Sequence, residues 1–312
     1  MTLIVFSYNR ALQLSAFLIS LFKHFKADKF KVTVIYNSGG GDFEKAYEQL
    51  KAQFPQVEFV RRKKIEKTPL SYLFRFKKNL YRYFKHKNLR EKLTDFKEVL
   101  ETAVANSPYE TVAFFTDDSI FFQDVYVKPE ILAEVANDKE FKTVYSLRHG
   151  LNLAVKPEQI FAYKESYAWN VVPSAPEMIH WTYLFSIDGH VYPKKFLLPI
   201  FRKLNYVNPN SFEGFVNDYV TNESSNIFNK LIFPSQNVLV GFELNQVQSF
   251  SNNNHHNFSV ELLNKRFLDG YRLRYLYDET TVTDFRPPLK GVEFYLEKNP
   301  AVKEEVLNLE QS

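Results

Sequence analysis

Two adjacent aspartates, Asp117 and Asp118, follow a run of apolar, β-branched and aromatic residues at 111–115. The run predicts a buried strand, and ligands of open α/β sheets bind beyond the carboxyl ends of the strands. Two carboxylates this close repel each other unless a cation lies between them, and their hard oxygens suit Mg²⁺ or Mn²⁺. Asp-Asp-Ser is also good turn chemistry, so the acid pair alone favours a metal site and a turn equally.

The elements that must position these acids alternate between strand and helix. Buried strands are predicted at 3–6, 31–36, 57–60 and 111–115, and helices at 14–25, 43–54 and 93–104. The first helix carries an apolar stripe at the spacing of one helical face. Alternation of this kind predicts an α/β fold with a mostly parallel sheet, right-handed crossovers and flanking helices.

The second half of the chain is less regular. Helices are expected at 128–135, 193–204 and 261–269, strands at 143–147 and 291–296, and extended chain at 231–248. Asp188-Gly189 is a turn signal. Ser211 is a predicted N-cap, which would place Glu213 in the first turn of a further helix. No internal repeat or linker divides the chain.

Composition limits the class of protein. The 312 residues are 45% hydrophobic and 24% charged, as in ordinary globular proteins, and they include no cysteine. Disulfides and thiolate chemistry are therefore excluded. The amino terminus has no basic segment before its apolar run, and no apolar run reaches membrane-spanning length. We therefore expect a cytoplasmic protein.

Basic charge is concentrated in residues 61–92. This stretch holds 13 Lys and Arg against two Glu, a net charge of +11, whereas the whole chain carries +4 and the remainder therefore −7. A helix at 70–85 would place basic side chains on one face and aromatic ones on the other. That pattern suits an anionic membrane surface on the cytoplasmic side or a polyanion. It also fits a helix docked on its own core with a solvated basic face, which is the more common case. Because the remainder is acidic, nucleic acid is not an expected partner.

Four further side chains have chemistry to offer. Arg148 could meet a sugar or a diphosphate, or form a structural ion pair. Trp181 could stack on an acceptor sugar, or lie in the core. His256 has the chemistry of a metal ligand or a diphosphate contact, although its Asn-rich surroundings indicate a loop, and His190 is similarly open.

The first 125 residues resemble the GT-A glycosyltransferases of the family-2 type. The resemblance rests on the opening Leu3-Ile-Val-Phe-Ser-Tyr-Asn-Arg10 with its following helix, and on Thr116-Asp-Asp118, which is similar to the acidic DXD motif of that family. It implies a GT-A-like, Rossmann-like sheet, with a nucleotide-sugar-binding half at 1–125 that contains the basic insertion 61–92. The half at 126–312 would be a mixed region that binds the acceptor and carries catalysis. One departure is the end of the second strand, where the family often has an Asp and this chain has Asn37-Ser38.

The resemblance also implies roles for the polar residues at the strand ends. Asp118 would bind Mn²⁺ or Mg²⁺, and Asp117 the ribose or a metal-bound water. The other expected nucleotide contacts are Ser7, Asn9, Arg10 and Asn37. The family places a catalytic carboxylate at the start of a later helix, which Glu213 fits best, with Asp188 as the main rival and Asp218 as a further one.

Together these patterns predict a metal-dependent glycosyltransferase. It would move a sugar from a nucleoside-diphosphate sugar, with UDP expected, to a glycan or lipid-linked glycan, with inversion. Two alternatives remain. A nucleotidyltransferase also uses acids on an α/β sheet, but its Gly-rich basic loop is not present after the first strand. A non-enzymatic polyanion- or membrane-binding protein would use the basic stretch and leave the strand-end acids unexplained.

Overall fold

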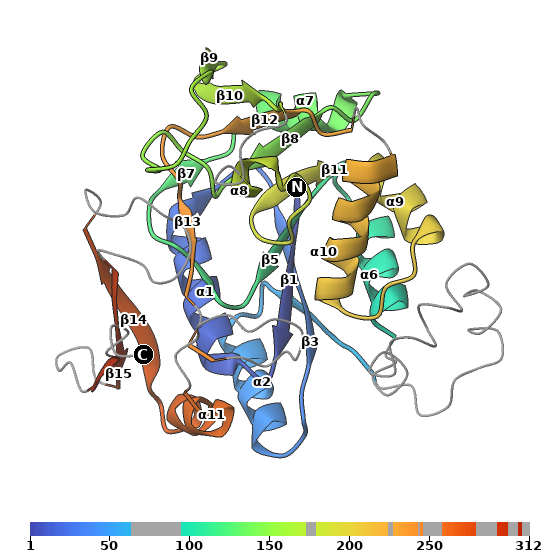
Figure 1. The fold of residues 1–312 in the computed structure, drawn as a ribbon. Coiled ribbons are helices and arrows are strands. Elements are labelled where there is room, and N and C mark those ends of the chain that lie inside the picture. Colours follow the sequence, from blue (N-terminus) through green and yellow to red (C-terminus); the bar gives the residue numbers. More distant parts are fainter. Residues whose placement is uncertain are drawn as a thin grey trace.

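The computed structural model describes residues 1–63, 95–172, 179–223, 227–242, 244–245, 258–278, 292–298 and 305–307. Within these residues a nine-stranded sheet forms the centre of the molecule, in the order β4-β3-β1-β5-β11-β8-β12-β10-β9 (Figure 1). Its strands are β1 (Thr2–Tyr8), β3 (Lys31–Asn37), β4 (Glu58–Arg61), β5 (Thr111–Thr116), β8 (Thr143–Ser146), β9 (Phe161–Tyr163), β10 (Ser166–Asn170), β11 (His190–Pro193) and β12 (Lys230–Phe233).

The strands of the first half run parallel, as their alternation with helices predicts. β1 lies between β3 and β5 and pairs with both in parallel register, and β4 adds to the outer edge of β3. β11 enters antiparallel between β5 and β8, and β10 is antiparallel to both of its neighbours. All other strands run in one direction. The predicted α/β class, a mostly parallel sheet flanked by helices, is therefore confirmed, and the GT-A assignment stays a prediction.

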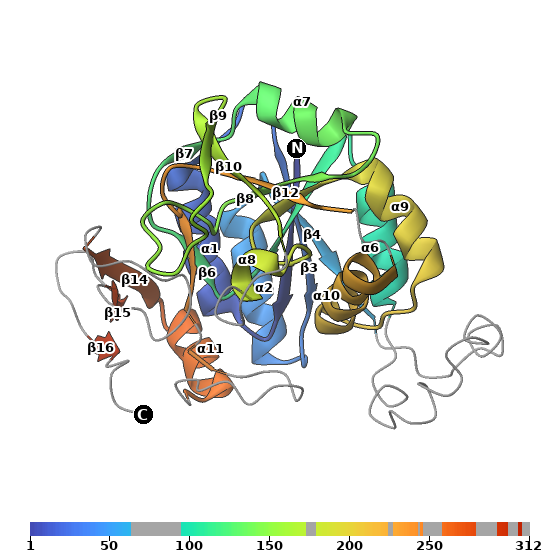
Figure 2. The ribbon, with the colours of Figure 1, turned by 45° about the horizontal axis from the view of Figure 1, so that its top comes forward.

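Helices cover both faces of the sheet. In Figure 2, α1, α2 and α11 lie on one side of the central strands, and α6, α9 and α10 lie on the other. The helices are α1 (Ala11–His24), α2 (Asp42–Gln53), α6 (Phe96–Ala105), α7 (Pro129–Asn137), α8 (Ile179–Thr182), α9 (Lys194–Lys203), α10 (Pro209–Asp218) and α11 (Val260–Leu268), and a π-helical turn, Tyr219–Glu223, continues α10.

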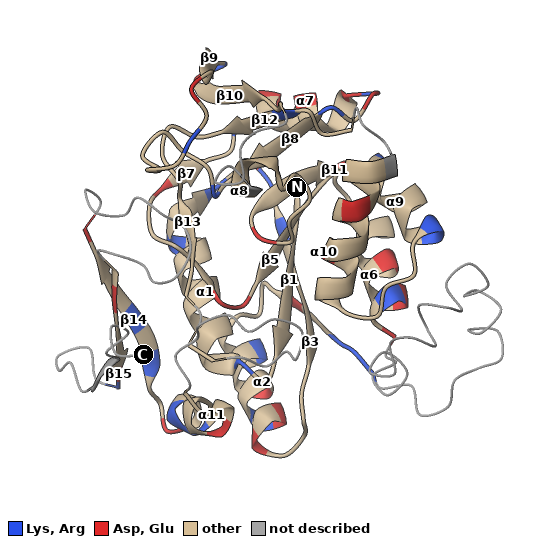
Figure 3. Cartoon of the chain, viewed as in Figure 1, with Lys and Arg blue, Asp and Glu red and all other residues tan. Residues whose placement is uncertain are grey.

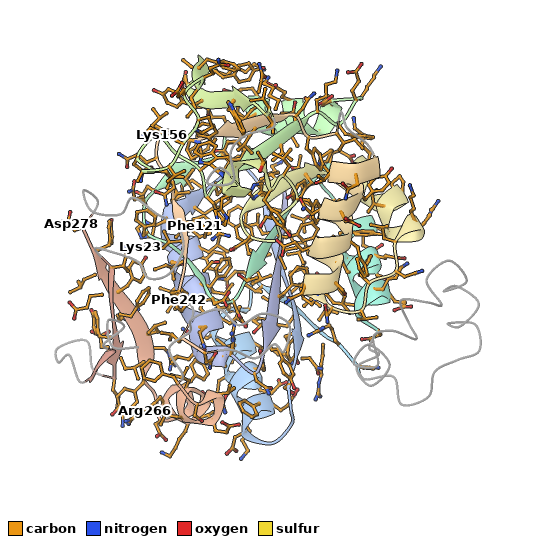
Figure 4. All side chains as sticks on the ribbon, viewed as in Figure 1. Lys23, Phe121, Lys156, Phe242, Arg266 and Asp278 are labelled. Carbon is orange, nitrogen blue, oxygen red and sulfur yellow. The ribbon has the colours of Figure 1, made fainter. Side chains whose placement is uncertain are left out.

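Smaller sheets pack around this centre. They are formed by β6 (Ser119–Phe121) with β13 (Leu239–Gly241), by β2 (Phe25–Lys26) with β7 (Val125–Tyr126), and by β14 (Arg272–Tyr277), β15 (Val292–Glu297) and β16 (Glu305–Leu307). The β6–β13 ribbon lies beside α1, where Phe121 and Phe242 are labelled in Figure 4. The Tyr275 hydroxyl donates to the carbonyl of Phe121 at 2.7 Å and ties β14 to this ribbon.

An aromatic cluster fastens α6 and α10 to the sheet. The ring of Phe114 on β5 stacks on Phe6 at 5.9 Å between centroids and meets the edge of Phe212 at 5.4 Å. Phe96, the first residue of α6, packs on Phe6 at 5.5 Å. Each such side chain stabilises the fold by roughly 1.5–3 kcal/mol through burial. Because Phe212 directly precedes Glu213, this packing also fixes the part of the α10 backbone that carries Glu213.

Two expectations about organisation are not settled by the fold. The central sheet contains strands from both 1–125 and 126–312, and a division of the chain at that point stays a prediction. Residues 64–92, which hold most of the basic stretch and its predicted amphipathic helix, lie outside the described residues. In the part of the chain that the structure describes, no helix combines the length and apolar character needed to cross a membrane.

Candidate active site

The acid pair lies where its sequence position predicts, at the carboxyl end of β5. The backbone N–H of Asp117 donates to the carbonyl of Phe6 on β1 at 3.2 Å, and the carbonyl of Asp118 accepts from the N–H of Phe242 at 2.7 Å. The turn is therefore held on one side by β1 and on the other by the chain that follows β13. Acidic positions lie in the loops of this central region, between α1 and α10 (Figure 3).

Asp117 is buried and fully engaged. Its Oδ2 accepts from the hydroxyl of Ser7 at 2.7 Å and from the N–H of Tyr8 at 3.4 Å, and its Oδ1 from Arg10 at 3.2 Å. Burial raises the pKa of Asp117 to about 6, against the opposing effect of the Arg10 charge. The predicted nucleotide residues Ser7 and Asp117 thus bind each other, and the side chain of Asp117 is 4% exposed.

Arg10 lies between the two acids. Its Nη1 contacts Asp117 at 3.2 Å and Asp118 at 2.7 Å, while its Nε donates to Oδ1 of Asn245 at 2.9 Å and its Nη2 to the Asn245 carbonyl. The arginine is 7% exposed. The cation that the acid pair requires is therefore a side chain of the protein itself. Because all three nitrogens of the guanidinium already have protein partners, these contacts do not support the predicted contact of Arg10 with a nucleotide.

This arrangement does not fit the divalent cation that the resemblance implies. Both oxygens of Asp117 are occupied, and Oδ2 of Asp118 is paired with Arg10. Among the described residues, no three His, Asp or Glu side chains come together in a group able to hold a metal ion. His256, the other predicted metal ligand, lies outside the described residues. The metal assignment of Asp118 stays a prediction that these contacts do not support.

Asp188 and Arg148 form a second charged group next to the acid pair. Oδ1 of Asp188 accepts from the Ser119 hydroxyl at 2.7 Å and from the Thr116 hydroxyl at 3.4 Å, and its Oδ2 pairs with Arg148. Thr116 and Ser119 flank the two acids, so Asp188 is joined to the end of β5. Arg148 is thus in the structural ion pair that was one of its two expected roles, and both oxygens of Asp188 have partners.

The turn at Asp188 depends on the next residue. Gly189 has a φ of +80°, a region that glycine adopts at little cost. A Cβ at this position would lie 2.5 Å from Cδ2 of Leu239. The backbone N–H of Gly189 donates to the Phe114 carbonyl at 2.8 Å, which fixes the turn against β5. The Asp-Gly signal in the sequence therefore marks a close approach of three segments.

Glu213 reaches this site from α10. Its Oε1 accepts from the N–H of Ile187 at 2.9 Å, one residue before Asp188. Burial raises the pKa of Glu213 to about 7, and the Asp188 charge adds to this, while the hydrogen bonds oppose it. A carboxyl with a pKa raised into this range can both accept and return a proton near neutral pH.

The start of α10 differs from the prediction. Asn208, not Ser211, is the N-cap: its side chain accepts from the N–H of Ser211, and the Ser211 hydroxyl accepts from the N–H of Asn208 at 3.1 Å. Ser211 is thus the third helical residue of a capping box. The helix begins at Pro209, which places Glu213 in the second turn, so burial and not the helix terminus governs its pKa.

The ends of β1 and β3 form one edge with a glycine loop. Oδ1 of Asn9 accepts from the N–H of Gly39 at 2.8 Å, and the N–H of Asn9 donates to the carbonyl of Asn37 at 3.4 Å. Gly40 and Gly41 have positive φ values, and a Cβ on either would meet nothing within 4 Å. Asn9 and Asn37 thus shape an open loop at the predicted nucleotide edge.

Trp181 and His190 are core residues. Trp181 is 2% exposed, and its rings pack on His149 at 4.4 Å and on Phe233 at 5.2 Å. Its indole N–H donates to the carbonyl of Val155 at 2.8 Å. His190 is also 2% exposed, in the central strand β11, and burial lowers its pKa to about 3. Both side chains are buried in this conformation, so the expected sugar contacts of these two residues stay a prediction that their burial does not support.

Two residues near the ends of β1, β3 and β4 were not identified as candidate site residues from the sequence. Tyr8 is an exposed tyrosine at the end of β1, 38% accessible. Arg62, just after β4, is 9% exposed; its guanidinium lies 5.3 Å from the Phe96 ring, and among the described residues it has no carboxylate within ion-pair distance. The available signal for Tyr8 was an aromatic between two polar strand-end residues. Arg62 is one of 13 basic residues at 61–92, and nothing in its residue type or position distinguishes it from neighbours that face solvent.

Comparisons with known proteins give distant structural similarity only. No protein-family model matches the chain, and no curated protein matches it in sequence. Among solved structures it is similar to S. aureus TarS 1–349 (17% identity, TM-score 0.36), and to the same fragment in complex with UDP (16%, 0.38). It is also similar to the mannosyltransferase PcManGT from Pyrobaculum calidifontis in complex with GDP-Man and Mn²⁺ (11%, 0.37). Each match covers 75% of this chain and 56–57% of the other, so the chain spans less than two thirds of those chains.

Proposed function

We propose that this chain is a glycosyltransferase of the GT-A, family-2-like type. It transfers a sugar, with inversion, from a nucleoside-diphosphate sugar, UDP-sugars first, to a hydroxyl of a glycan or lipid-linked glycan. The observation that carries the proposal is Glu213: a carboxyl whose pKa is raised to about 7 by burial, held against the Asp188 turn at the ligand-binding edge of a mostly parallel sheet.

Glu213 is the general base of the proposed reaction. Its ionised form takes the proton of the acceptor hydroxyl while the hydroxyl oxygen attacks the anomeric carbon. The bond from that carbon to the diphosphate oxygen breaks, and the nucleoside diphosphate leaves with the electron pair. Attack opposite the leaving group inverts the anomeric configuration. A pKa near the working pH suits a general base, which typically contributes 10²–10⁴-fold.

The donor is proposed to lie across the ends of β1, β3 and β4. Tyr8 offers an accessible ring on which a base can stack. Arg62 has no carboxylate within ion-pair distance in the described part of the chain and is close enough to Tyr8 for the two to interact electrostatically. A guanidinium matches diphosphate geometry, and such a ligand would compensate a buried charge on which Asp95, beyond ion-pair distance, is the carboxylate that acts in the described part of the chain. No step is assigned to a divalent cation, because Arg10 occupies the acid pair.

The test is release of nucleoside diphosphate from a panel of nucleotide sugars, with and without Mn²⁺. We expect turnover with one donor class, and a loss of 10²–10⁴-fold in kcat, with little change in KM, for Glu213→Gln. Glu130→Gln, an exposed carboxyl in the first turn of α7, is the matched control and should behave as wild type. Wild-type turnover in Glu213→Gln would transfer the base role to Asp188. Absence of turnover with every donor would refute the transferase.

A further inference from the structure

Arg10 satisfies the requirement that pointed to a metal in the sequence. Two neighbouring carboxylates need a cation, and the guanidinium contacts both through a single nitrogen, at 3.2 Å to Asp117 and 2.7 Å to Asp118. The side chains of Arg10 and Asp117 are 8% and 4% exposed. The charge of the pair is thus compensated inside the protein, with water largely excluded.

The arginine is itself held in place by its other nitrogens. Nε donates to Oδ1 of Asn245 at 2.9 Å and Nη2 to the carbonyl of the same residue, 235 positions along the chain. The Asn245 side chain is in turn contacted by the amide of Gln13 at 3.2 Å, one turn along α1. A flat, forked guanidinium can make all of these contacts at once, and a lysine ammonium cannot. Removing Arg10 from the acids would therefore also break the link to Asn245.

A divalent cation at the same acids would have to share the space with this fixed charge. Oδ1 of Asp117 is bound to Arg10 and Oδ2 to Ser7. Asp118 alone would remain as a ligand, through a carboxylate whose Oδ2 faces the guanidinium at 2.7 Å. A cation of +2 a few ångström from a buried +1 is strongly repelled.

We infer that Arg10 is the permanent counter-ion of the Asp117–Asp118 pair and that it stands in the place of a divalent metal. Asp118 is then a positioning residue: it holds the guanidinium that joins the β1–α1 loop, the β5–β6 turn and the segment at Asn245. This inference rests on the contacts of the acid pair and not on the proposed function. It concerns which cation the pair holds, whatever reaction the site performs.

The test is direct binding of Mn²⁺, followed by the loss of its free electron paramagnetic resonance signal, with no nucleotide present. Wild type and Asp118→Asn should leave the free signal equally unchanged. Arg10→Gln should acquire one site, with at least about tenfold higher affinity than wild type, because the repelling charge is gone. The double variant Arg10→Gln/Asp118→Asn should lose that site again.

Stoichiometric Mn²⁺ binding by wild type that Asp118→Asn abolishes would overturn the inference, and so would a folded Arg10→Gln protein that gains no site. Arg10→Lys is the charge control: it should keep Mn²⁺ out, while it melts at a lower temperature because the contacts with Asn245 are lost. If Arg10→Gln does not fold, the comparison of wild type with Asp118→Asn still decides the question. Because no donor or acceptor is used, failure of the transferase assay would leave this result intact.

Discussion

Replacing Glu213 with Gln should make the protein more stable above neutral pH while it removes most of the transfer activity. The carboxyl is half-buried on α10 and accepts a hydrogen bond from the N–H of Ile187 at 2.9 Å. Gln has nearly the same shape, and its amide oxygen can accept the same bond. The substitution therefore removes the titrating proton and leaves the packing in place.

The size of the effect follows from the pKa of Glu213. Burial raises it from an ordinary value of 4.5 to about 7, so the folded protein holds this proton more tightly than the unfolded chain. Below pH 4.5 both states are protonated and the group costs nothing. As the pH rises from 4.5 to about 7, the free energy of unfolding falls, and the loss reaches about 3 kcal/mol above pH 7. The Glu213→Gln variant does not lose this free energy of unfolding as the pH rises.

The assay is thermal or urea unfolding of wild type, Glu213→Gln and the Glu130→Gln control at pH 5 to 8.5. The melting temperatures of wild type and Glu213→Gln should nearly coincide at pH 5 and differ by about 5 °C at pH 8, with the variant higher. Other titrating groups, Asp117 among them, are common to all three proteins and cancel in the difference. A gap that does not change with pH would show that Glu213 has no raised pKa, and the base assignment would lose its physical support.

Three further substitutions test the site. Arg62→Met should raise stability by about 1–3 kcal/mol, because it removes a buried charge that has no carboxylate within ion-pair distance among the described residues, yet weaken donor binding in titrations with nucleoside diphosphate; Lys23→Met, at an exposed position of α1, should change neither. Gly189→Ala should cost about 1–3 kcal/mol in urea unfolding, since φ is +80° and the new Cβ would meet Leu239 at 2.5 Å; an unchanged midpoint would contradict the geometry. Phe212→Ala should cost about 3–5 kcal/mol and most of the turnover, and turnover retained in the folded variant would separate α10 packing from catalysis.

Much of the fold was accessible from local patterns. The run at 111–115, with its abrupt change to two acids, is the β5 strand and its turn, because a buried strand must be apolar and its end must return to polar chain. The helix at 43–54 differs from α2 by one residue at each end. The predicted N-cap of α10 was wrong by three residues, since Asn208 and Ser211 both have the chemistry of a cap and only the backbone decides which one is used.

The site was predicted less completely, for a physical reason. Trp181 and Arg148 each had one functional and one structural interpretation in the sequence. In the structure Trp181 is buried and Arg148 is in an ion pair, as the structural interpretations expect, and the functional ones stay predictions. Arg62 looked like one charge among many in a basic stretch, and only its burial distinguishes it. Exposure is a property of the packed molecule, so residue type and spacing could not supply it.

The sequence by itself determined the alternation of strands and helices and the position of two carboxylates at a strand end, because these depend on residues close together in the chain. Only the tertiary structure decided which cation those carboxylates receive. That depends on Arg10 and Asn245, 235 residues apart, coming to the same point. Likewise, the pKa of Glu213 follows from the water that α10 and the Asp188 turn exclude, which no local pattern encodes.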